Sequence, residues 1–196
     1  MTFDELVAEV YLLTNRPDLT AETTSAVKAA TLKAHQTDYY SKDIYETGIQ
    51  FTTSEFRQSL DYISLLSNFR AFKYLRKATS ATDDTGAFFG ILTPEETLDS
   101  YGANKTDIAY VAGRVLEIRS STTFQYAYLG CYVLPVIRTG AYVSWVAEQH
   151  PYAIIYEACR VMFKAIGFDE QSATFERLVA EEYQLLRMSG LTDVGY

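Results

Sequence analysis

The stretch from residue 150 to residue 188 limits most strongly what this chain can fold into, because it has the pattern of two helices joined by a tight turn. Apolar residues recur at helical spacing in its first half and predict one buried stripe: Ile154, Ile155, Ala158, Val161, Met162, Ala165 and Ile166. Pro151 is tolerated in a first helical turn, and Gly167 can supply the left-handed residue that ends the helix.

The second half of this stretch predicts a helix that begins with Asp169 as its cap. Its apolar stripe consists of Phe175, Leu178, Val179, Tyr183 and Leu186. Because the connection is so short, the two helices must lie antiparallel or cross at a steep angle. Neither stripe contains a catalytic constellation, so we interpret this helical hairpin as an element for packing and docking.

Two more helices are expected near the N-terminus. Thr2 and Glu5 have capping-box spacing, and the helix that they begin should end near Asn15, just ahead of Pro17. A second helix is expected from Thr20 to about Tyr39, with a face of mostly small residues. Residues 1–40 and 150–188 together therefore predict a small helical bundle.

The region between these helical parts, residues 43–146, reads mainly as β-structure. Apolar alternation predicts strands at 45–51, 60–64 and 69–77, and a hairpin of Ile108–Arg119 with Phe124–Pro135 across the connection Ser120–Thr123. Both faces of the run from Phe124 are apolar, so both should be covered. The polar residues 78–87 predict a loop, and Thr93, Pro94 and Glu96 predict the start of a short helix.

These elements define an α+β fold: a small helical bundle, built from the N-terminal helices and the C-terminal helical hairpin, with an inserted antiparallel β module. We expect residues 1–196 to form a single domain in which 189–196 is a tail.

Charge and composition exclude some classes of function. The net charge is −8 and the pI about 4.8, which argues against tight nucleic-acid binding through a basic face but not against a surface past which nucleic acid slides. The 16 tyrosines fit a hydrated β-sheet face or a protein interface.

Cys131 and Cys159 are expected to be buried free thiols. No signal peptide or membrane-spanning run is apparent, so synthesis in a reducing compartment, the cytoplasm, is expected.

Few residues suggest a catalytic, cofactor-binding or metal-binding site. Asp84-Thr85-Gly86 is similar to the catalytic turn of aspartic proteases, but it occurs once and follows a polar loop rather than a strand. We interpret His35 and Asp38 as a surface helix pair, and Cys159 as a structural thiol rather than a partner of His150. An acid pair of the glycosidase kind remains open among Glu95, Glu96, Asp99, Glu181 and Glu182. The sequence thus predicts no catalytic, cofactor-binding or metal-binding residues.

In the order and residue pattern of several segments, the sequence resembles the head-to-tail adaptor (connector, head-completion) proteins of tailed bacteriophages. The resemblance covers most of the chain and rests on segments 14–19, 29–35, 43–46, 68–76, 112–114 and 165–170. The residues that carry it include Asn68–Arg76 and the turn Ala165–Glu170. It includes no catalytic signature.

The resemblance implies a structural virion protein at the head–tail junction. Such proteins form homo-oligomeric rings, typically of twelve copies, under the portal, where they continue the channel for double-stranded DNA without sequence-specific binding and offer a platform to tail or nozzle proteins. The resemblance also implies a C-terminal segment that reaches toward the portal, and we predict Leu191, Val194 and Tyr196 as partner-binding residues. The alternatives are another neck or tail-completion protein, or a hydrolase of the cell-wall or aspartic-protease kind.

Overall fold

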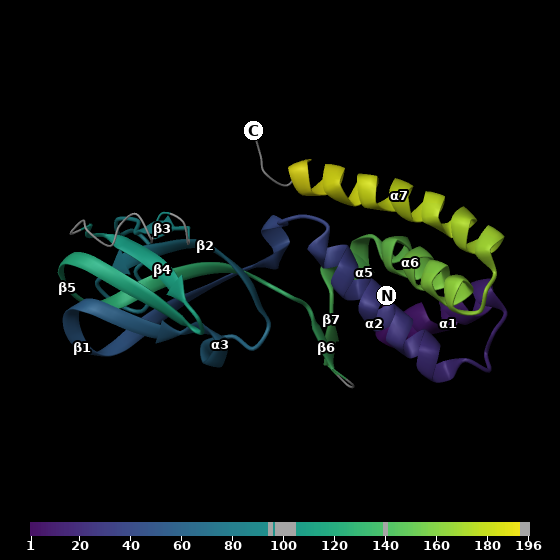
Figure 1. The fold of residues 1–196 in the computed structure, drawn as a ribbon, viewed down its shortest axis with the longest axis horizontal. Helices are drawn as coiled ribbons and strands as arrows, with labels where there is room; N and C mark the ends of the chain where they lie inside the picture. Colours follow the sequence, from purple (N-terminus) through teal and green to yellow (C-terminus); the bar gives the residue numbers. More distant parts are fainter. Residues whose placement is uncertain (94–95, 97–104, 139–140, 193–196) are drawn as a thin grey trace. The chain divides into compact units, whose positions relative to one another are not determined.

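The structure is a computed structural model that describes residues 1–93, 96, 105–138 and 141–192, with the backbone alone for 190–192. The fold is α+β, as the sequence predicts. The chain divides into two compact units (Figure 1): a helical unit of residues 1–43 and 134–196, and a β unit of residues 44–133 that is inserted into it. Residues 134–146, which the sequence patterns group with the β module, pack in the helical unit.

The helical unit is assembled around one central helix, α6 (Pro151–Ala165). Helices α1 (Phe3–Thr14), α2 (Thr20–Gln36) and α7 (Asp169–Thr192) all pack against it (Figure 1). The remaining elements are a 3-10 turn η1 (Ser41–Asp43), the hairpin β6 (Val136–Arg138) with β7 (Ala141–Val143), and the short helix α5 (Trp145–Gln149). Because α6 has neighbours on several sides, it buries polar as well as apolar residues.

The first helix begins and ends as predicted. Thr2 and Glu5 form a reciprocal capping box, which satisfies two N–H groups at the helix start. Asn15 ends the helix in the left-handed region at φ 51°. Helix α2 ends at Gln36, three residues earlier than expected, and its buried face consists of Thr23, Ala26, Val27, Ala30, Thr31, Ala34 and His35.

The turn between α6 and α7 also matches the expectation. Gly167 has φ +80°, the Phe168 N–H donates to the Phe163 carbonyl at 2.9 Å, and the two phenylalanine rings meet at 6.3 Å. Asp169 is the first residue of α7 rather than its cap. The helix continues to Thr192, so residues 189–192, which we expected in the tail, are helical.

The β unit is organised by one long strand, β5 (Val115–Val133). Strand β1 (Ile44–Asp61) pairs antiparallel along nearly all of it. On the other edge, β4 (Ile108–Ala112) pairs with the first part of β5, and β2 (Phe69–Ala78) pairs with the second part. Residues 87–89 hydrogen-bond to β2 and lead into β3 (Gly90–Leu92), which pairs parallel to β4. The sheet is therefore mixed rather than purely antiparallel.

Two of the expected strands were misplaced. The hairpin connection is Gly113-Arg114 rather than Ser120–Thr123, which lies inside β5. Gly113 adopts φ +65°, as the first position of a tight two-residue hairpin turn requires. The strand expected at 60–64 does not form, because β1 ends at Asp61 and Tyr62–Leu65 make a helical turn, α3, capped by the Asp61 side chain.

The core of the β unit is mostly apolar and aromatic. Along β5 the buried hydrophobic positions are Leu116, Ile118, Phe124, Ala127, Leu129 and Cys131. The buried parity changes between Phe124 and Ala127, where the pairing with β1 shifts register, so Phe124 joins the core instead of the tyrosine face expected for it. The opposite face, with Tyr126, Tyr128 and Tyr132, is only half-buried.

The polar segment 79–87 is a loop, as predicted. Of the short helix expected at 93, only Thr93 and Glu96 are described. The Thr93 N–H donates to Glu96 Oε2 at 2.8 Å, and the Glu96 N–H donates to Thr93 Oγ1 at 3.3 Å, which is the predicted capping contact. The remainder of that helix lies outside the described residues.

Candidate functional site

A buried hydrogen-bonded chain of side chains lies in the helical unit and links three segments that are far apart in sequence. His35 in the last turn of α2 places Nδ1 2.7 Å from Asp43 Oδ1 in η1. Its Nε2 lies 2.9 Å from Oγ of Ser144, the residue that caps α5. The exposed fractions are 2% for His35, 5% for Asp43 and 4% for Ser144, so the whole chain is withdrawn from solvent.

The donors and acceptors in this network follow from chemistry. A carboxylate can only accept, so Asp43 takes the Nδ1 proton of His35 as well as the indole N–H of Trp145 at 2.7 Å. When the imidazole carries only the Nδ1 proton, Nε2 accepts from the Ser144 hydroxyl. The Ala147 N–H donates to Ser144 Oγ at 3.2 Å, which is the N-cap bond of α5. Trp145 packs edge-on against the rings of His35 and Tyr40.

The predicted surface pair of His35 with Asp38 is wrong, because His35 is buried and bonded to Asp43 and Ser144. The periodicity of α2 could have revealed this. Buried residues recur along the helix at 23, 26, 27, 30, 31 and 34, and position 35 continues that face. No sequence signal identifies its partners, since Ser144 is 109 residues away.

The order Ser–His–Asp is the relay that serine hydrolases use, so we asked what it can do here. In those enzymes the serine Oγ must reach a substrate carbonyl while the imidazole takes its proton. Ser144 is almost fully buried, and its Oγ already accepts the helix-capping N–H. The geometry therefore fits a structural role: it fixes the end of α2 and the start of α5 to Asp43, the last residue before the chain enters the β unit.

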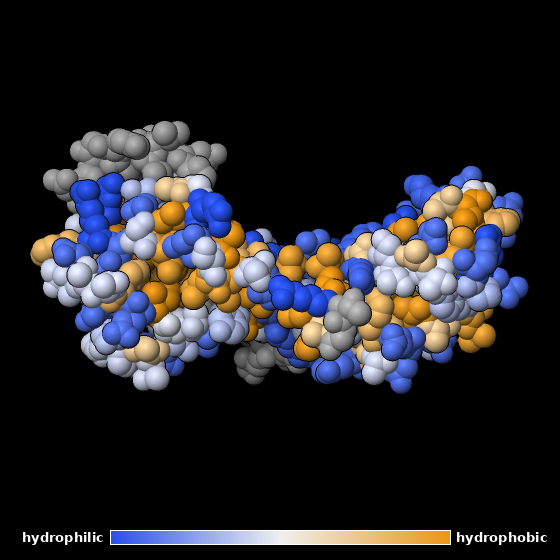
Figure 2. All heavy atoms as spheres, turned by 90° about the horizontal axis from the view of Figure 1, so that it is seen from below, coloured by the Kyte–Doolittle hydropathy of each residue, from blue (hydrophilic) through white to orange (hydrophobic). Residues whose placement is uncertain are grey.

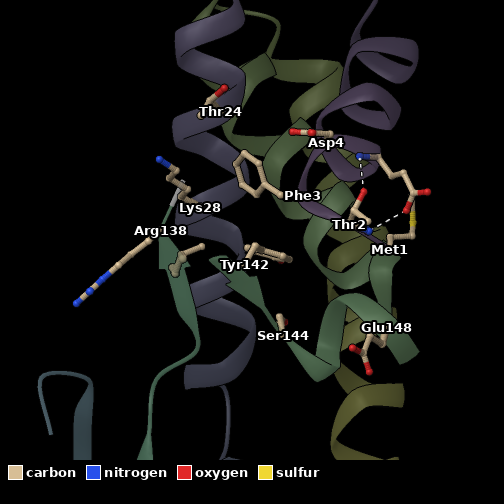
Figure 3. A pocket seen from close by; sticks show the side chains of 12 residues that line it. Met1, Thr2, Phe3, Asp4, Thr24, Lys28, Arg138, Tyr142, Ser144 and Glu148 are labelled. Atoms are coloured by element: carbon tan, nitrogen blue, oxygen red, sulfur yellow. Dashed lines mark hydrogen bonds between the residues drawn. The ribbon is translucent and has the colours of Figure 1, made fainter. Parts of the chain in front are cut away.

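A pocket of about 720 Å³ lies beside this network (Figure 3). It is lined by residues of α1, α2, the β6–β7 hairpin and α5, including Phe3, Lys28, Arg138, Tyr142 and Glu148. The rings of Phe3 and Tyr142 lie 5.2 Å apart, and the Tyr142 hydroxyl is 3.0 Å from Thr31 Oγ1. Burial raises the pKa of Tyr142, so this hydroxyl stays protonated at neutral pH.

Charges in the pocket are separated. Figure 3 shows Lys28 and Arg138 on one side of the Phe3–Tyr142 pair, and Met1 and Glu148 on the other. The Met1 amino group donates to the Ala147 carbonyl at 2.8 Å. An apolar floor flanked by charged groups can hold a segment of another chain that presents an apolar side chain between polar groups.

A buried ion cluster is the second polar feature of the helical unit. Glu157 of α6, with 2% of its surface exposed, lies 2.7 Å from Nζ of Lys33 in α2 and accepts two hydrogen bonds from Arg160. Burial acts to raise the pKa of Glu157, but the hydrogen bonds from Arg160 and Lys33 outweigh it and hold the pKa below its usual value. The cluster ties α2 to α6.

The remaining candidate groups do not come together. Asp83 accepts hydrogen bonds from Thr79 and Thr85, which lower its pKa, while Arg76 bonds to the Asp84 carbonyl; the Asp-Thr-Gly segment is thus part of a folded polar loop. His150 contacts Ser189, and Cys159 is buried in the core.

Of the proposed acid-pair residues, Glu95 and Asp99 lie outside the described residues. Glu96 is bonded to Thr93. Glu181 and Glu182 are consecutive on α7, so their side chains point in different directions.

The predicted partner-binding residues are only partly visible. Leu191 lies in the last turn of α7, and its side chain is not described. Val194 and Tyr196 lie outside the described residues. Within the described part of the chain, no three histidine, cysteine or acidic side chains are grouped as a metal site would require.

No protein-family model matches this chain, and no curated protein matches its sequence. Among the described helices, none is long and apolar enough to cross a membrane.

Proposed function

We propose that this chain is a non-enzymatic structural protein of the neck of a tailed bacteriophage. In this proposal it forms a homo-oligomeric ring under the portal, at the head–tail junction of the virion, and continues the DNA channel toward the tail or nozzle proteins. The observation that supports it best is the architecture: a β unit with its own core is inserted into a helical unit with its own core. The resemblance of the sequence implies this combination.

Exposed apolar side chains give further support. On the helical unit these include Leu185 and Met188 of α7, at 53% and 56% exposure, and Tyr152 of α6. Phe56 and Phe88 are more than half exposed on the β unit, and Figure 2 shows apolar atoms at the surface of both units. A protein that contacts several neighbours in a ring needs such surfaces on more than one part of the chain.

The test uses the portal protein of the same phage, because ring closure converts many weak contacts into one stable assembly. The purified chain is mixed with portal rings and studied by native mass spectrometry and negative-stain microscopy. We expect about twelve copies on each portal ring, the number that the resemblance implies, arranged as a closed symmetric ring. A chain that stays monomeric beside intact portal rings would overturn the adaptor assignment. Binding to tail proteins alone would assign it to an adjacent neck or tail-completion ring.

Substitutions test whether the C-terminal segment contacts the portal. The combined change Leu191→Ser, Val194→Ser and Tyr196→Ser should abolish the complex if the C-terminal segment binds the portal. Leu12→Ser, at a position of α1 that is 74% exposed, is the matched control for loss of an exposed apolar group and should bind as the wild type does. Equal binding by both variants would remove the C-terminal segment from the interface.

One observation favours a second candidate, a serine hydrolase: the relay of Ser144, His35 and Asp43 beside a pocket. Burial of Ser144 weighs against it. A fluorophosphonate probe tests for hydrolase activity, because it phosphonylates an activated serine and releases fluoride. Labelling of the wild type that is lost in Ser144→Ala would establish the hydrolase, and an unlabelled folded protein would dismiss it.

A further inference from the structure

The outer face of the β unit carries a small basic pocket that differs from the rest of this acidic chain. The pocket has a volume of about 270 Å³ and lies where β1, β5 and the segment before β4 meet. Its lining includes three cations, Arg57, Lys105 and Arg119, and the hydroxyl residues Thr106 and Ser121. None of the lining residues that the structure describes is acidic.

The position of the two arginines is unusual. Arg57 of β1 and Arg119 of β5 are direct partners in the antiparallel ladder, so their side chains leave the sheet side by side. Like charges directly opposite each other destabilise a strand pair. In a chain with 25 acidic and 17 basic residues, this placement of two arginines calls for a compensating group.

The groups around the pocket do not supply that compensation. Arg119 donates to the Tyr110 hydroxyl at 3.0 Å and lies over the Tyr110 ring, which is a neutral partner. Arg57 has no hydrogen bond or ion pair with any residue that the structure describes. Arg119 is thus held in place while Arg57 retains a complete set of free donors.

The nearby carboxylates are already engaged. Glu117, two residues before Arg119, accepts the Ser59 hydroxyl at 2.8 Å. Asp107 accepts from the Ser121 N–H at 3.1 Å and from the Ser120 hydroxyl at 3.3 Å. Glu96, which interacts with Lys105, is bonded to the Thr93 N–H. The Ser121 hydroxyl also bonds to Asp107 and helps to lower the pKa of that carboxyl group.

We propose that this pocket binds a phosphate group. The two guanidinium groups would each give paired N–H donors to phosphate oxygens, Lys105 would add a third positive charge, and the Thr106 hydroxyl would complete the set. The volume is below the roughly 300–1,000 Å³ of pockets that enclose drug-sized ligands, so it suits the phosphate itself rather than a whole nucleotide. Free phosphate and a phosphodiester of duplex DNA share this chemistry.

The first arm of the test measures inorganic phosphate with the full chain in phosphate-free buffer at constant ionic strength, by the line width of its ³¹P resonance. The wild type should bind, and Arg57→Gln should weaken binding at least about tenfold, since a charge-assisted paired contact is lost. Arg114→Gln is the matched control, because Arg114 is an exposed arginine of the same unit on the β4–β5 turn. It should bind as the wild type does.

The second arm measures a 20-base-pair duplex by fluorescence anisotropy between 50 and 200 mM salt. If the duplex binds and Arg57→Gln weakens it while Arg114→Gln does not, the phosphate belongs to a DNA backbone; if only free phosphate binds, the site takes the small anion. Either result supports the site. The absence of binding in both arms, or equal binding by Arg57→Gln and the wild type, overturns it. Because Arg57 is exposed and makes no described contact, this variant should fold normally.

Discussion

The two units of this protein fill their interiors with different chemistry. Nine polar or charged residues are buried in the described chain, and all but Ser120 belong to the helical unit: Thr14, Thr23, Thr31, His35, Asp43, Ser144, Glu157 and Ser172. The β unit instead has a core of aliphatic and aromatic side chains, with edge-to-face and tilted ring contacts around Phe124 and Tyr62. The helical unit therefore combines an apolar core with buried directional bonds, whereas the β unit relies mainly on packing.

Because of this difference, substitutions should destabilise the two units in different ways. A buried polar network is costly when one member is removed, because its partners remain desolvated and unpaired. A close-packed apolar core responds instead to lost volume. Trp145, the sole tryptophan, lies in the polar network and so reports on the helical unit alone. The following predictions use that contrast.

The largest effect is expected from a cavity in the β unit. Leu129 is fully buried on β5, between β1 and β2, and Leu129→Ala should lower the free energy of unfolding by about 3–4 kcal/mol. Hydrogen exchange measured by mass spectrometry should show lost protection in residues 44–133 and little change in the helices. Val111→Ala, at an exposed position of β4, is the control and should change little. Equal loss of protection in both units would mean that they unfold together.

A slightly smaller effect is expected when the ion cluster of the helical unit is broken. Glu157→Ala leaves Arg160 partly buried without its partner, while the half-exposed Lys33 can turn to solvent. We expect a loss of about 3 kcal/mol, near the lower end for a broken buried pair. Urea unfolding followed by Trp145 fluorescence measures it. Glu181→Ala removes an exposed carboxylate from α7 and is the control; a matching loss there would show that net charge, not burial, is responsible.

Much of the helical unit could be predicted from the sequence because its signals are local. The capping box of Thr2 and Glu5 and the turn at Gly167 each lie within a few residues of the contacts that they make. The hairpin turn was predicted in the wrong place because the serines and threonines of Ser120–Thr123 can lie in a strand as well as in a loop. The actual turn lies at Gly113, whose positive φ allows the tight connection.

The candidate site could not be assembled from the sequence for the opposite reason. His35 stands out in a chain with two histidines, but its partners come from a 3-10 turn and from a capping residue beyond the whole β unit. Side chains that meet only after the fold has closed leave no pattern along the chain. The same holds for Arg57 and Arg119, which are paired by a register that the predicted hairpin did not contain.

Acid should weaken the helical unit through protonation of the buried Glu157. The pKa of Glu157 is lower in the folded protein than its ordinary value of 4.5, so its contribution is complete at neutral pH and is lost as the pH falls through 4.5 toward the folded pKa. The urea midpoint reported by Trp145 should therefore drop between pH 6 and pH 3.5. Glu157→Gln cannot titrate and should show a shallower drop. An identical pH dependence in both proteins would assign the acid sensitivity to other carboxylates.

The smallest effect, in rate rather than stability, comes from the two thiols, which lie one in each unit. Burial raises the pKa of Cys131 to about 11 and that of Cys159 to about 12, so both stay protonated and should react slowly with thiol reagents in the native protein. At pH 4, below the ordinary pKa of a glutamate, and in mild urea, a dipyridyl disulfide should label Cys159 before Cys131. Mass spectrometry of the peptides gives the order. Labelling of Cys131 first would reverse the contrast between the units, because it would make the apolar core of the β unit the weaker of the two in acid.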